Sequence, residues 1–444
     1  NTDYIMSSRH RTQTLDDLYV SVFRPANNIH WPGNVKKYKI ANGQIVDATG
    51  APAIDKGFFK DGTRSIWSSV ADGNKVDLGG AASNMPDPDA RNLYTYLGVS
   101  TTLNNAANAV KTTNTALTDA LLGLGAPGLP AHDELIEWMR GRDVQDDNGN
   151  DNFTEARLDM GDPIHAKPAV VIYGGTAAAN DVDDAVVFAA ENDGYLHAFD
   201  VTNGQELWSF VPAELLSGMP ALFANGVQPE KHYGLDGDIR VFKIDRNANG
   251  VIEPSNGDRV YIYFGMRRGG TSYYALDVTT KTNPQFMWQL APGNVALPGQ
   301  LPALGQTWST PVAAKVNISG ATQNADKFVL IFGGGYEDSQ DNEPYNTDLI
   351  GNRIYMIDAV SGALLWSVGG PNGAGVPAPD LSLAKMNNSI PADLLVLDTN
   401  QDGFADRIYA TDTGARIWRF DIANGQPRGS LVAGGVFASA ITAL

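Results

Sequence analysis

Two short stretches of the chain alternate oxygen-bearing side chains with other residues around a glycine. The first reads DTNQDGFAD over residues 398–406, and the second reads DRNANGVIE over residues 245–253. In both, Asp or Asn occupies positions one, three and five, Gly occupies position six, and an acid occupies position nine. Ca²⁺ prefers carboxylate and carbonyl oxygens at such a spacing, and Gly permits the sharp bend. The sequence therefore predicts two calcium loops.

Each loop offers four side chains and one backbone carbonyl as calcium ligands. In the first loop these are Asp398, Asn400, Asp402, the carbonyl of Phe404, and Asp406. In the second they are Asp245, Asn247, Asn249, the carbonyl of Val251, and Glu253. The first loop has three carboxylates and the second has two, so we predict that the first loop binds Ca²⁺ more tightly. A bidentate Glu253 could reverse that order.

Neither loop is an EF-hand. Position twelve is Tyr409 in one loop and Asn256 in the other, where an EF-hand has a bidentate Glu, and the flanking sequences read as strands. The alternative for both is an Asx-rich turn that binds no metal. A third acidic stretch, at 143–156, has Gly149 out of register, so we expect a solvated loop there.

Motifs for catalysis are missing from the sequence. The six histidines form no HxH or HExxH pair, and no GxSxG, P-loop or dinucleotide fingerprint occurs. Asp162 and His165 could serve in acid–base chemistry, but their position at the start of a repeat favours a structural hydrogen bond. His197 lies in an alternating strand, which favours packing. We therefore predict that the chain is not an enzyme.

Composition narrows the function further. The chain has 444 residues, 43% of them hydrophobic, which suffices for a large core, and a formal net charge of −18. That charge argues against binding nucleic acid, which requires basic patches. The absence of cysteine excludes disulfides, thiolate metal sites and cysteine nucleophiles. No apolar run approaches the roughly 18 residues of a membrane span.

Four segments repeat one pattern, in which an alternating strand ends in Asp before a turn. In three of them a strand with Trp follows. The segments are YLHAFDVTNGQELW (195–208), SYYALDVTTKTNPQFMW (272–288), RIYMIDAVSGALLW (353–366) and RIWRFDIANGQ (416–426). Another strand precedes each segment, and repeated antiparallel hairpins of this kind are typical of propeller blades. We expect Trp208, Trp288 and Trp366 to lie between or within blades, and two β-sandwiches are the alternative.

The expected fold is all-β, a modified β-propeller with elaborated loops and a short helical insertion. Residues 1–100 are expected to form an early blade, with strands at 18–25, 34–41, 65–70 and 75–80. Residues 101–160 are expected to be a helical insertion, with a helix over 130–141, followed by the acidic loop. Residues 161–444 are expected to hold the main blades. The terminal VFASAITAL looks strand-like, which suggests a cut through structure.

Several motifs, in order along nearly the whole chain, resemble the C-terminal region of the PilY/PilC family of type IV pilus biogenesis factors and tip-associated adhesins. They include LYVSVFRPANNIHWPGNVKKYKI, ELIEWMRGRD, GDPIHAKPAVVIYGG, VVFAAENDGYLHAFD and DTNQDGFADRIYATDTGARIWRFD. The resemblance implies a calcium-binding modified propeller, exported through the periplasm to the pilus tip or outer cell surface. It implies roles in pilus extension and retraction, twitching motility and attachment, with minor pilins and a host-cell or surface receptor as partners.

The resemblance also bears on particular residues. The family's calcium loop in this region matches 245–253, with Asn and Glu at positions five and nine where Asp is commoner. Some members carry an Arg-Gly-Asp integrin motif, but this chain has only RGRD at 140–143, so integrin binding is not supported.

Two other functions stay open. The repeats also resemble the propellers of pyrroloquinoline quinone dehydrogenases, but those enzymes typically carry an adjacent-cysteine disulfide that this chain cannot form. A metal-free periplasmic scaffold is the third possibility. Calorimetry with Ca²⁺ and dye reduction would distinguish the three.

Overall fold

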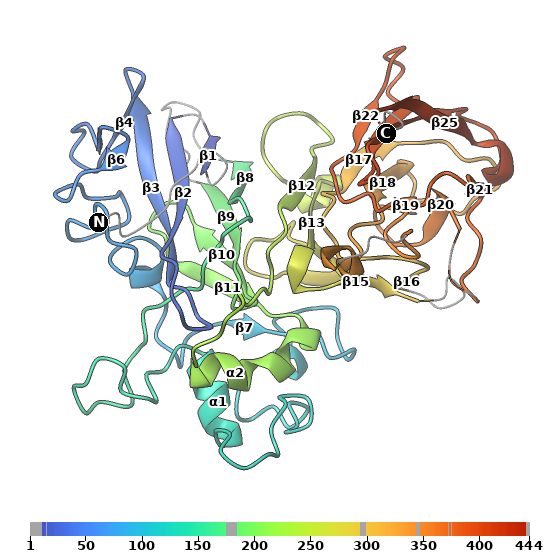
Figure 1. Cartoon of the computed structure of the whole chain (residues 1–444). Helices are drawn as coiled ribbons and strands as arrows, with labels where there is room; N and C mark the ends of the chain where they lie inside the picture. Colours follow the sequence, from blue (N-terminus) through green and yellow to red (C-terminus); the bar gives the residue numbers. More distant parts are fainter. Residues whose placement is uncertain are drawn as a thin grey trace. The chain divides into compact units, whose positions relative to one another are not determined.

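The computed structural model describes residues 11–14, 16–174, 184–293, 299–342, 347–371, 373 and 375–440. Strands dominate this part of the chain (Figure 1), and its α-helices are α1 (His132–Met139) and α2 (Met219–Ala224). The all-β prediction is confirmed. The chain divides into unit 1 (Asn1–Tyr261 with Asp277–Phe286) and unit 2 (Ile262–Leu276 with Met287–Leu444).

The first sheet has four antiparallel strands in the order β1-β2-β3-β4. Its strands are β1 (Arg11–Thr14), β2 (Asp17–Phe23), β3 (Gly33–Ala41) and β4 (Gln44–Val46). A separate two-stranded sheet pairs β5 (Ile54–Asp55) with β6 (Phe58–Phe59). Leu18, Val20, Val22 and Tyr38 pack into one buried cluster, as expected for strands whose alternate side chains face a core.

The second sheet runs in the order β7-β11-β10-β9-β8. Its strands are β7 (Leu93–Tyr94), β8 (Ala169–Gly174), β9 (Asp184–Ala190), β10 (Leu196–Asp200) and β11 (Glu206–Phe210). Helices α1 and α2 lie side by side near β7 (Figure 1), and Leu93, Ile136 and Leu222 share one hydrophobic cluster. Helix α1 starts after Ala131, whose backbone N–H donates to the Glu134 carboxylate, an arrangement that favours helix initiation.

Three further sheets, of five, five and four strands, follow along the chain. The third has the order β12-β13-β14-β15-β16, the fourth β17-β18-β19-β20-β21 and the fifth β22-β23-β24-β25. The third contains β12 (Ile239–Ile244), β13 (Arg259–Gly265), β14 (Tyr273–Asp277), β15 (Gln285–Pro292) and β16 (Gln300–Leu301). The fourth contains β17 (Val312–Lys315), β18 (Phe328–Gly333), β19 (Arg353–Asp358), β20 (Leu364–Gly369) and β21 (Leu381–Ser382). The fifth contains β22 (Leu395–Leu397), β23 (Arg407–Thr411), β24 (Arg416–Ile422) and β25 (Val432–Ser439).

The repeated Asp residues end strands as predicted in three of the four segments. The carboxylate of Asp200 accepts a hydrogen bond from the N–H of Thr202 at 2.8 Å, and Asp277 accepts one from Thr279 at 2.9 Å. Asp358 accepts from Val360 and Ser361 in the same way. These Asx turns reverse the chain. In the fourth segment β24 continues past Asp421, which pairs with Arg407 at 2.7 Å.

The repeated tryptophans connect sheets within each unit. The indole N–H of Trp208 donates to the carbonyl of Lys281 at 2.7 Å, and that of Trp288 donates to Ala359 at 3.4 Å. Trp366 packs in the core of unit 2 with Trp418. The expected placement of these side chains is confirmed.

Two expected strands are wrong. Residues 65–70 and 75–80 form turns, because the buried Asp72 carboxylate gathers the N–H and hydroxyl of Ser65 and the hydroxyl of Ser68 at 2.7–2.8 Å. Gly79 and Gly80 take positive φ angles of 67° and 60°, which a strand does not allow.

The short helical insertion is confirmed, because α1 lies within the predicted residues 130–141. Within residues 101–160, only α1 is an α-helix and most of the remainder is turns. At the C-terminal end, β25 confirms the strand-like character of the first part of VFASAITAL, and residues 441–444 lie outside the described part. His10 lies outside it as well.

Candidate functional site

The loop of residues 245–253 connects β12 to β13, so two strands fix its ends. Asp245 accepts a hydrogen bond from the N–H of Gly250 at 2.8 Å through Oδ2, while its Oδ1 is buried and has no hydrogen-bond partner. The side-chain amides of Asn247 and Asn249 both donate to Oε2 of Glu253, at 3.1 and 3.0 Å. Four of the five predicted ligand residues therefore supply side chains that are held together within one loop.

Asp258 closes this loop, and the sequence analysis missed it. Its buried carboxylate accepts the backbone N–H of Arg246 at one end and of Glu253 at the other, both at 2.8 Å. These two hydrogen bonds lower the pKa of Asp258, and the one from Arg246 has the larger effect. Because Asp258 holds the ends together, Glu253 is left to face the amides of Asn247 and Asn249.

The loop of residues 398–406 connects β22 to β23. Asp398 accepts the N–H of Gly403 at 2.8 Å, which repeats the bond between Asp245 and Gly250. Asn400 and Asp402 also lie within the loop, with the Asn400 amide donating to Asp402 Oδ2 at 3.1 Å. Asp406 behaves differently, since its Oδ2 accepts the N–H and hydroxyl of Thr399, both at 2.7 Å. In this loop the acid at position nine therefore also closes the loop.

The acidic loop after α1 shares two backbone features with both predicted loops, although Asp146 at its position one also has a positive φ angle of 54°. Counted from Asp146, positions four and six are Gly149 and Asp151, with φ angles of 69° and 61°. Ala248 and Gly250 take 54° and 86° at these positions, and Gln401 and Gly403 take 63° and 89°. The sequence reading placed Gly149 out of register because it looked for glycine at position six, where this loop has Asp151. In this third loop Glu155 accepts hydrogen bonds from the amides of Asn148, Asn150 and Asn152.

The donors in these loops are mixed. Across the ranges that the structure describes, no three acidic or histidine side chains gather closely enough to form a metal site by themselves. A cation at either predicted loop would therefore also need amide and backbone carbonyl oxygens, which Ca²⁺ accepts readily.

Asp162 and His165 bond to different partners. Asp162 lies 2.6 Å from Lys231 Nζ and accepts from the Asn192 amide at 2.8 Å. Burial raises the pKa of Asp162 to about 7, against the lowering effect of Lys231. His165 Nδ1 lies 2.6 Å from the buried carboxylate of Asp236. These contacts agree with the structural role favoured from the sequence.

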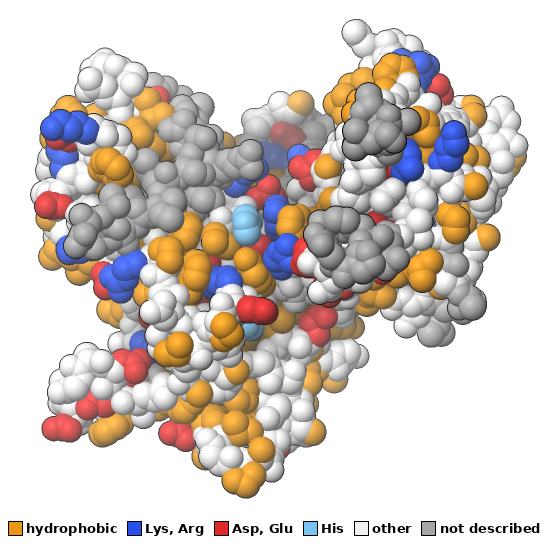
Figure 2. All heavy atoms as spheres, viewed as in Figure 1, with side chains coloured by type: hydrophobic (Ala, Val, Ile, Leu, Met, Phe, Trp, Pro, Cys, Tyr) orange, Lys and Arg blue, Asp and Glu red, His pale blue; other side chains and the backbone are white. Residues whose placement is uncertain are grey.

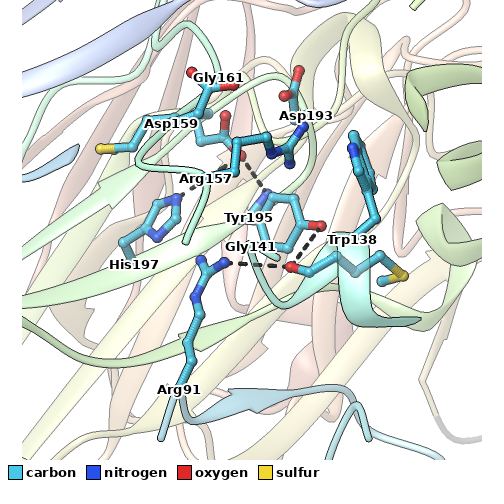
Figure 3. A pocket seen from close by; sticks show the side chains of 12 residues that line it. Arg91, Trp138, Gly141, Arg157, Asp159, Gly161, Asp193, Tyr195 and His197 are labelled. Atoms are coloured by element: carbon cyan, nitrogen blue, oxygen red, sulfur yellow. Dashed lines mark hydrogen bonds and ion pairs between the residues drawn. The ribbon is translucent and has the colours of Figure 1, made fainter. Parts of the chain in front are cut away.

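His197 belongs to a buried charged cluster in unit 1, and Figure 3 shows it near Arg91 and Tyr195. Its Nδ1 lies 2.6 Å from Glu206, which also binds Arg91 at 2.7 Å. Burial opposes ionisation, but Arg91 and His197 lower the pKa of Glu206 to about 2. Oε2 of Glu191 and Nε2 of His197 are buried without a hydrogen-bond partner. They line a cavity of about 20 Å³, roughly the room that one water needs.

His30 joins the same cluster from the loop between β2 and β3. Its Nδ1 lies 2.6 Å from Asp193, and its Nε2 lies 3.1 Å from Asp159. Burial acts to lower the pKa of His30, but the charges of Asp193 and Asp159 outweigh it and raise the pKa well above the ordinary value.

Two observations concern other kinds of partner. Figure 2 shows Lys and Arg side chains scattered among acidic ones on the face in view, without one broad basic patch. In the RGRD stretch, Arg140 and Asp143 are both buried, and Arg140 donates to the Val110 carbonyl at 3.0 Å. Among the described residues, no helix has the length and hydropathy needed to cross a membrane.

Comparison with known proteins places this chain in a family. The model of the PilY1 beta-propeller domain matches residues 160–439. The type IV pilus biogenesis factor PilY1 of Pseudomonas aeruginosa (strain PAO1) is 27% identical over 311 residues, which are 66% of this chain and 23% of that protein. The chain thus spans about a quarter of the length of the curated relatives that it matches.

Two solved structures are also similar. The crystal structure of the Pseudomonas aeruginosa PilY1 C-terminal domain aligns with a TM-score of 0.35 and 26% identity, over 53% of this chain and 38% of that one. The quinohemoprotein alcohol dehydrogenase ADHIIG of Pseudomonas putida HK5 aligns with a TM-score of 0.31 and 15% identity, over 57% and 33%. Both scores are too low to decide between functions.

Proposed function

The chain belongs to the PilY1 β-propeller domain family, and from this premise we propose that it is the calcium-binding propeller of a type IV pilus biogenesis factor. The single observation that carries the calcium part is the loop of residues 245–253. There, carboxylate and amide groups from alternate residues converge between two strands, and one buried carboxylate oxygen, Asp245 Oδ1, has no partner.

The donor set of this loop fits a hard cation. An unpartnered buried carboxylate oxygen is costly unless something compensates it, and a dication beside Asp245 would do so. The amide oxygens of Asn247 and Asn249 already accept one N–H each, from Asn249 and Val251. Since an amide oxygen has two lone pairs, each could also bind a cation. With Glu253 and the Val251 carbonyl, five residues of the loop would hold the ion.

The loop of residues 398–406 is the second proposed site. Its donors are Asp398, Asn400, Asp402, the carbonyl of Phe404, and Asp406. Its backbone follows that of the loop of residues 245–253, with positive φ angles at positions four and six.

In this proposal the ion fixes a loop and takes no part in a reaction. A catalytic metal needs an open coordination position and a partner base, whereas here one loop supplies nearly the whole ligand set. Neither β12–β13 nor β22–β23 carries a histidine in its strands or loop. Calcium would neutralise the clustered carboxylates and hold one loop surface in a single conformation for a partner to recognise.

Calcium titration tests the binding part. Isothermal titration calorimetry on chelator-treated protein, with metal counting by mass spectrometry, should find two ions per chain. Asp245→Ala and Asp402→Ala should each remove one of them. Asp61→Ala, which replaces an exposed carboxylate outside the loops, is the matched control. No calcium bound at millimolar Ca²⁺ would overturn this part of the proposal.

The biological part covers partners and location. We expect an exported protein at the pilus tip or outer cell surface, contacting minor pilins and a surface or host-cell receptor, and acting in extension, retraction and adhesion. Deleting the coding region for this chain should abolish or reduce surface pili and twitching, and complementation should restore them. Normal piliation, twitching and attachment in the deletion strain would contradict it.

A quinoprotein dehydrogenase is the second candidate, favoured by the likeness of the repeats to those propellers. The chain has no cysteine and therefore cannot form the adjacent-cysteine disulfide typical of them. Incubation with pyrroloquinoline quinone and Ca²⁺, followed by a dye-reduction assay with primary alcohols, distinguishes the two. Dye reduction above the background given by heat-denatured protein would favour the enzyme.

A further inference from the structure

A second cavity, of about 430 Å³, lies in unit 1 beside the charged cluster. Helices α1 and α2 contribute Trp138, Leu222 and Phe223 to its lining, and the loop before β3 contributes His30. The volume falls within the range of about 300–1,000 Å³ that small-molecule sites occupy. None of its lining residues belongs to the loops of residues 245–253 or 398–406, so the cavity is independent of the proposed calcium sites.

Charged side chains of both signs line this cavity. Three cationic side chains (Arg24, His30, Arg157) and three carboxylates (Asp77, Asp147, Asp159) line it. Arg24 pairs with Asp77 at 3.4 Å, and His30 pairs with Asp159 at 3.1 Å. The cationic and anionic groups of the lining balance in number, and Asp193 adds a carboxylate behind His30 at 2.6 Å, so the cavity has no excess positive charge that would select an anion. It offers many donors and acceptors to an uncharged polar molecule instead.

Two donors in the lining are buried and unpartnered. The indole Nε1 of Trp138 has no hydrogen-bond partner although the side chain is only 4% exposed, and Nε of Arg157 has none either. The guanidinium of Arg157 lies 4.2 Å from the centre of the Trp138 ring, so each side chain holds the other in place. Both are labelled in Figure 3, where they line the smaller neighbouring cavity as well. Because both of these nitrogens are buried, a ligand in the cavity would contact other atoms of the two side chains, which line it.

The remaining lining is apolar and aromatic. Phe223 meets Trp138 edge to face, with ring centres 5.7 Å apart, and Leu222 lies beside them in the same cluster. Hydroxyl groups both donate and accept, so a polyhydroxylated ring could satisfy carboxylates and guanidinium together while its C–H face packs on the apolar side. We propose that this cavity binds an uncharged carbohydrate residue.

Ligand-observed NMR tests the proposal with a defined panel. Saturation-transfer difference spectra would be recorded with glucose, galactose, mannose, fucose and N-acetylglucosamine, and with glucuronic and sialic acid as charged members. All measurements would be made in EDTA, so that failure of the calcium sites cannot affect the result. At least one neutral sugar should give a signal, and it should bind at least fivefold more tightly than its charged counterparts.

Variants locate the binding. Asp147→Asn removes a carboxylate from the lining, and Phe223→Ala removes part of the apolar side; each should weaken the neutral sugar at least fivefold. Asp61→Asn, an exposed carboxylate elsewhere in unit 1, should leave binding unchanged. Far-UV spectra and melting temperatures check that each variant folds. If Phe223→Ala does not fold, the binding measured with Asp147→Asn decides whether the cavity is the site. Absence of any sugar signal, binding of charged sugars alone, or equal binding by Asp147→Asn would each overturn the proposal.

Discussion

The indole N–H of Trp208 donates a hydrogen bond to the backbone carbonyl of Lys281 across 2.7 Å. Trp208 lies in β11, and Lys281 lies in the turn that follows Asp277. Trp67 makes the same kind of bond to the carbonyl of Val201, which directly follows Asp200, at 2.9 Å. In both cases the turn after a repeated Asp presents a backbone carbonyl, and a Trp from an earlier segment of the chain donates to it. The hydrogen bond therefore attaches the turn of one sheet to the segment that carries the Trp.

Trp208→Phe should therefore destabilise unit 1. The variant keeps an aromatic side chain but leaves the Lys281 carbonyl without its donor, which costs about 1–3 kcal/mol in a buried site. Urea unfolding followed by far-UV circular dichroism measures the loss. Phe153→Leu, at a side chain that is 52% exposed, is the control and should change stability by no more than about 0.5 kcal/mol. Equal stability of Trp208→Phe and the parent would show that the bond contributes nothing.

The sequence predicted the repeats because their signals are local. An alternating strand, an Asp and a turn occupy consecutive residues, so Asp200, Asp277 and Asp358 could be read without the fold. Trp67 was missed as a repeat member because its neighbours form Ser and Asp turns instead of the expected strand. Periodicity locates strands, while a side chain such as Asp72, which binds a backbone N–H and two neighbouring hydroxyls, can replace a strand with turns.

Site residues outside a motif were harder to predict. Asp258 lies five residues beyond the nine-residue loop that it closes, and nothing in the spacing indicates it. The loop from Asp146 was set aside because Asp151, instead of glycine, takes the positive φ angle at position six. The lining of the 430 Å³ cavity comes from residues between Arg24 and Asn225, and only the fold brings them together.

Asp258 should control calcium affinity without being a ligand. Asp258→Ala releases both ends of the loop of residues 245–253, and removal of such a supporting group typically weakens metal binding about 10–100-fold. Asp258→Asn keeps one acceptor and should fall between Asp258→Ala and the parent. Calorimetric titration with Ca²⁺ measures the effect, with Asp61→Ala as the control. Unchanged affinity in Asp258→Ala would mean that the loop is closed by other contacts.

The structure also changes the expected order of the two calcium loops. Carboxylate count alone favours residues 398–406, but Asp406 there accepts hydrogen bonds from Thr399 that close the loop. In the loop of residues 245–253 Asp258 performs that task, and Glu253 remains directed at the loop interior. We therefore expect Asp245→Ala to remove the tighter binding phase and Asp402→Ala the weaker one. A competition titration with a fluorescent chelator measures the two binding phases. If Asp402→Ala removes the tighter phase instead, the loop of residues 398–406 binds more tightly, as the carboxylate count predicts.

His30 should make stability depend on pH. Asp193 and Asp159 raise its pKa in the folded state, so its stabilising contribution is fully present below the unfolded value of about 6.5. That contribution is lost as the pH rises through the folded pKa. His30→Gln should accordingly melt well below the parent at pH 6, and the gap should narrow toward pH 9. His132→Gln is the control, because His132 faces the single exposed carboxylate of Asp119. A gap that stays constant with pH would assign His30 a packing role alone.

The last prediction separates the charge of calcium from its geometry. If Ca²⁺ acts by neutralising and fixing the loop of residues 245–253, a lysine at the position of Asp245 should supply part of the missing positive charge. Asp245→Ala should then impair pilus retraction, while Asp245→Lys should retain more of it although neither variant binds calcium there. Twitching-zone diameter and surface pilin measure the outcome, and Asp61→Lys controls for an added lysine elsewhere. Far-UV spectra should match the parent, because the apolar strands β12 and β13 do not depend on the ion. If both Asp245 variants fold and twitch like the parent, calcium at this loop has no role in motility and serves only local stability.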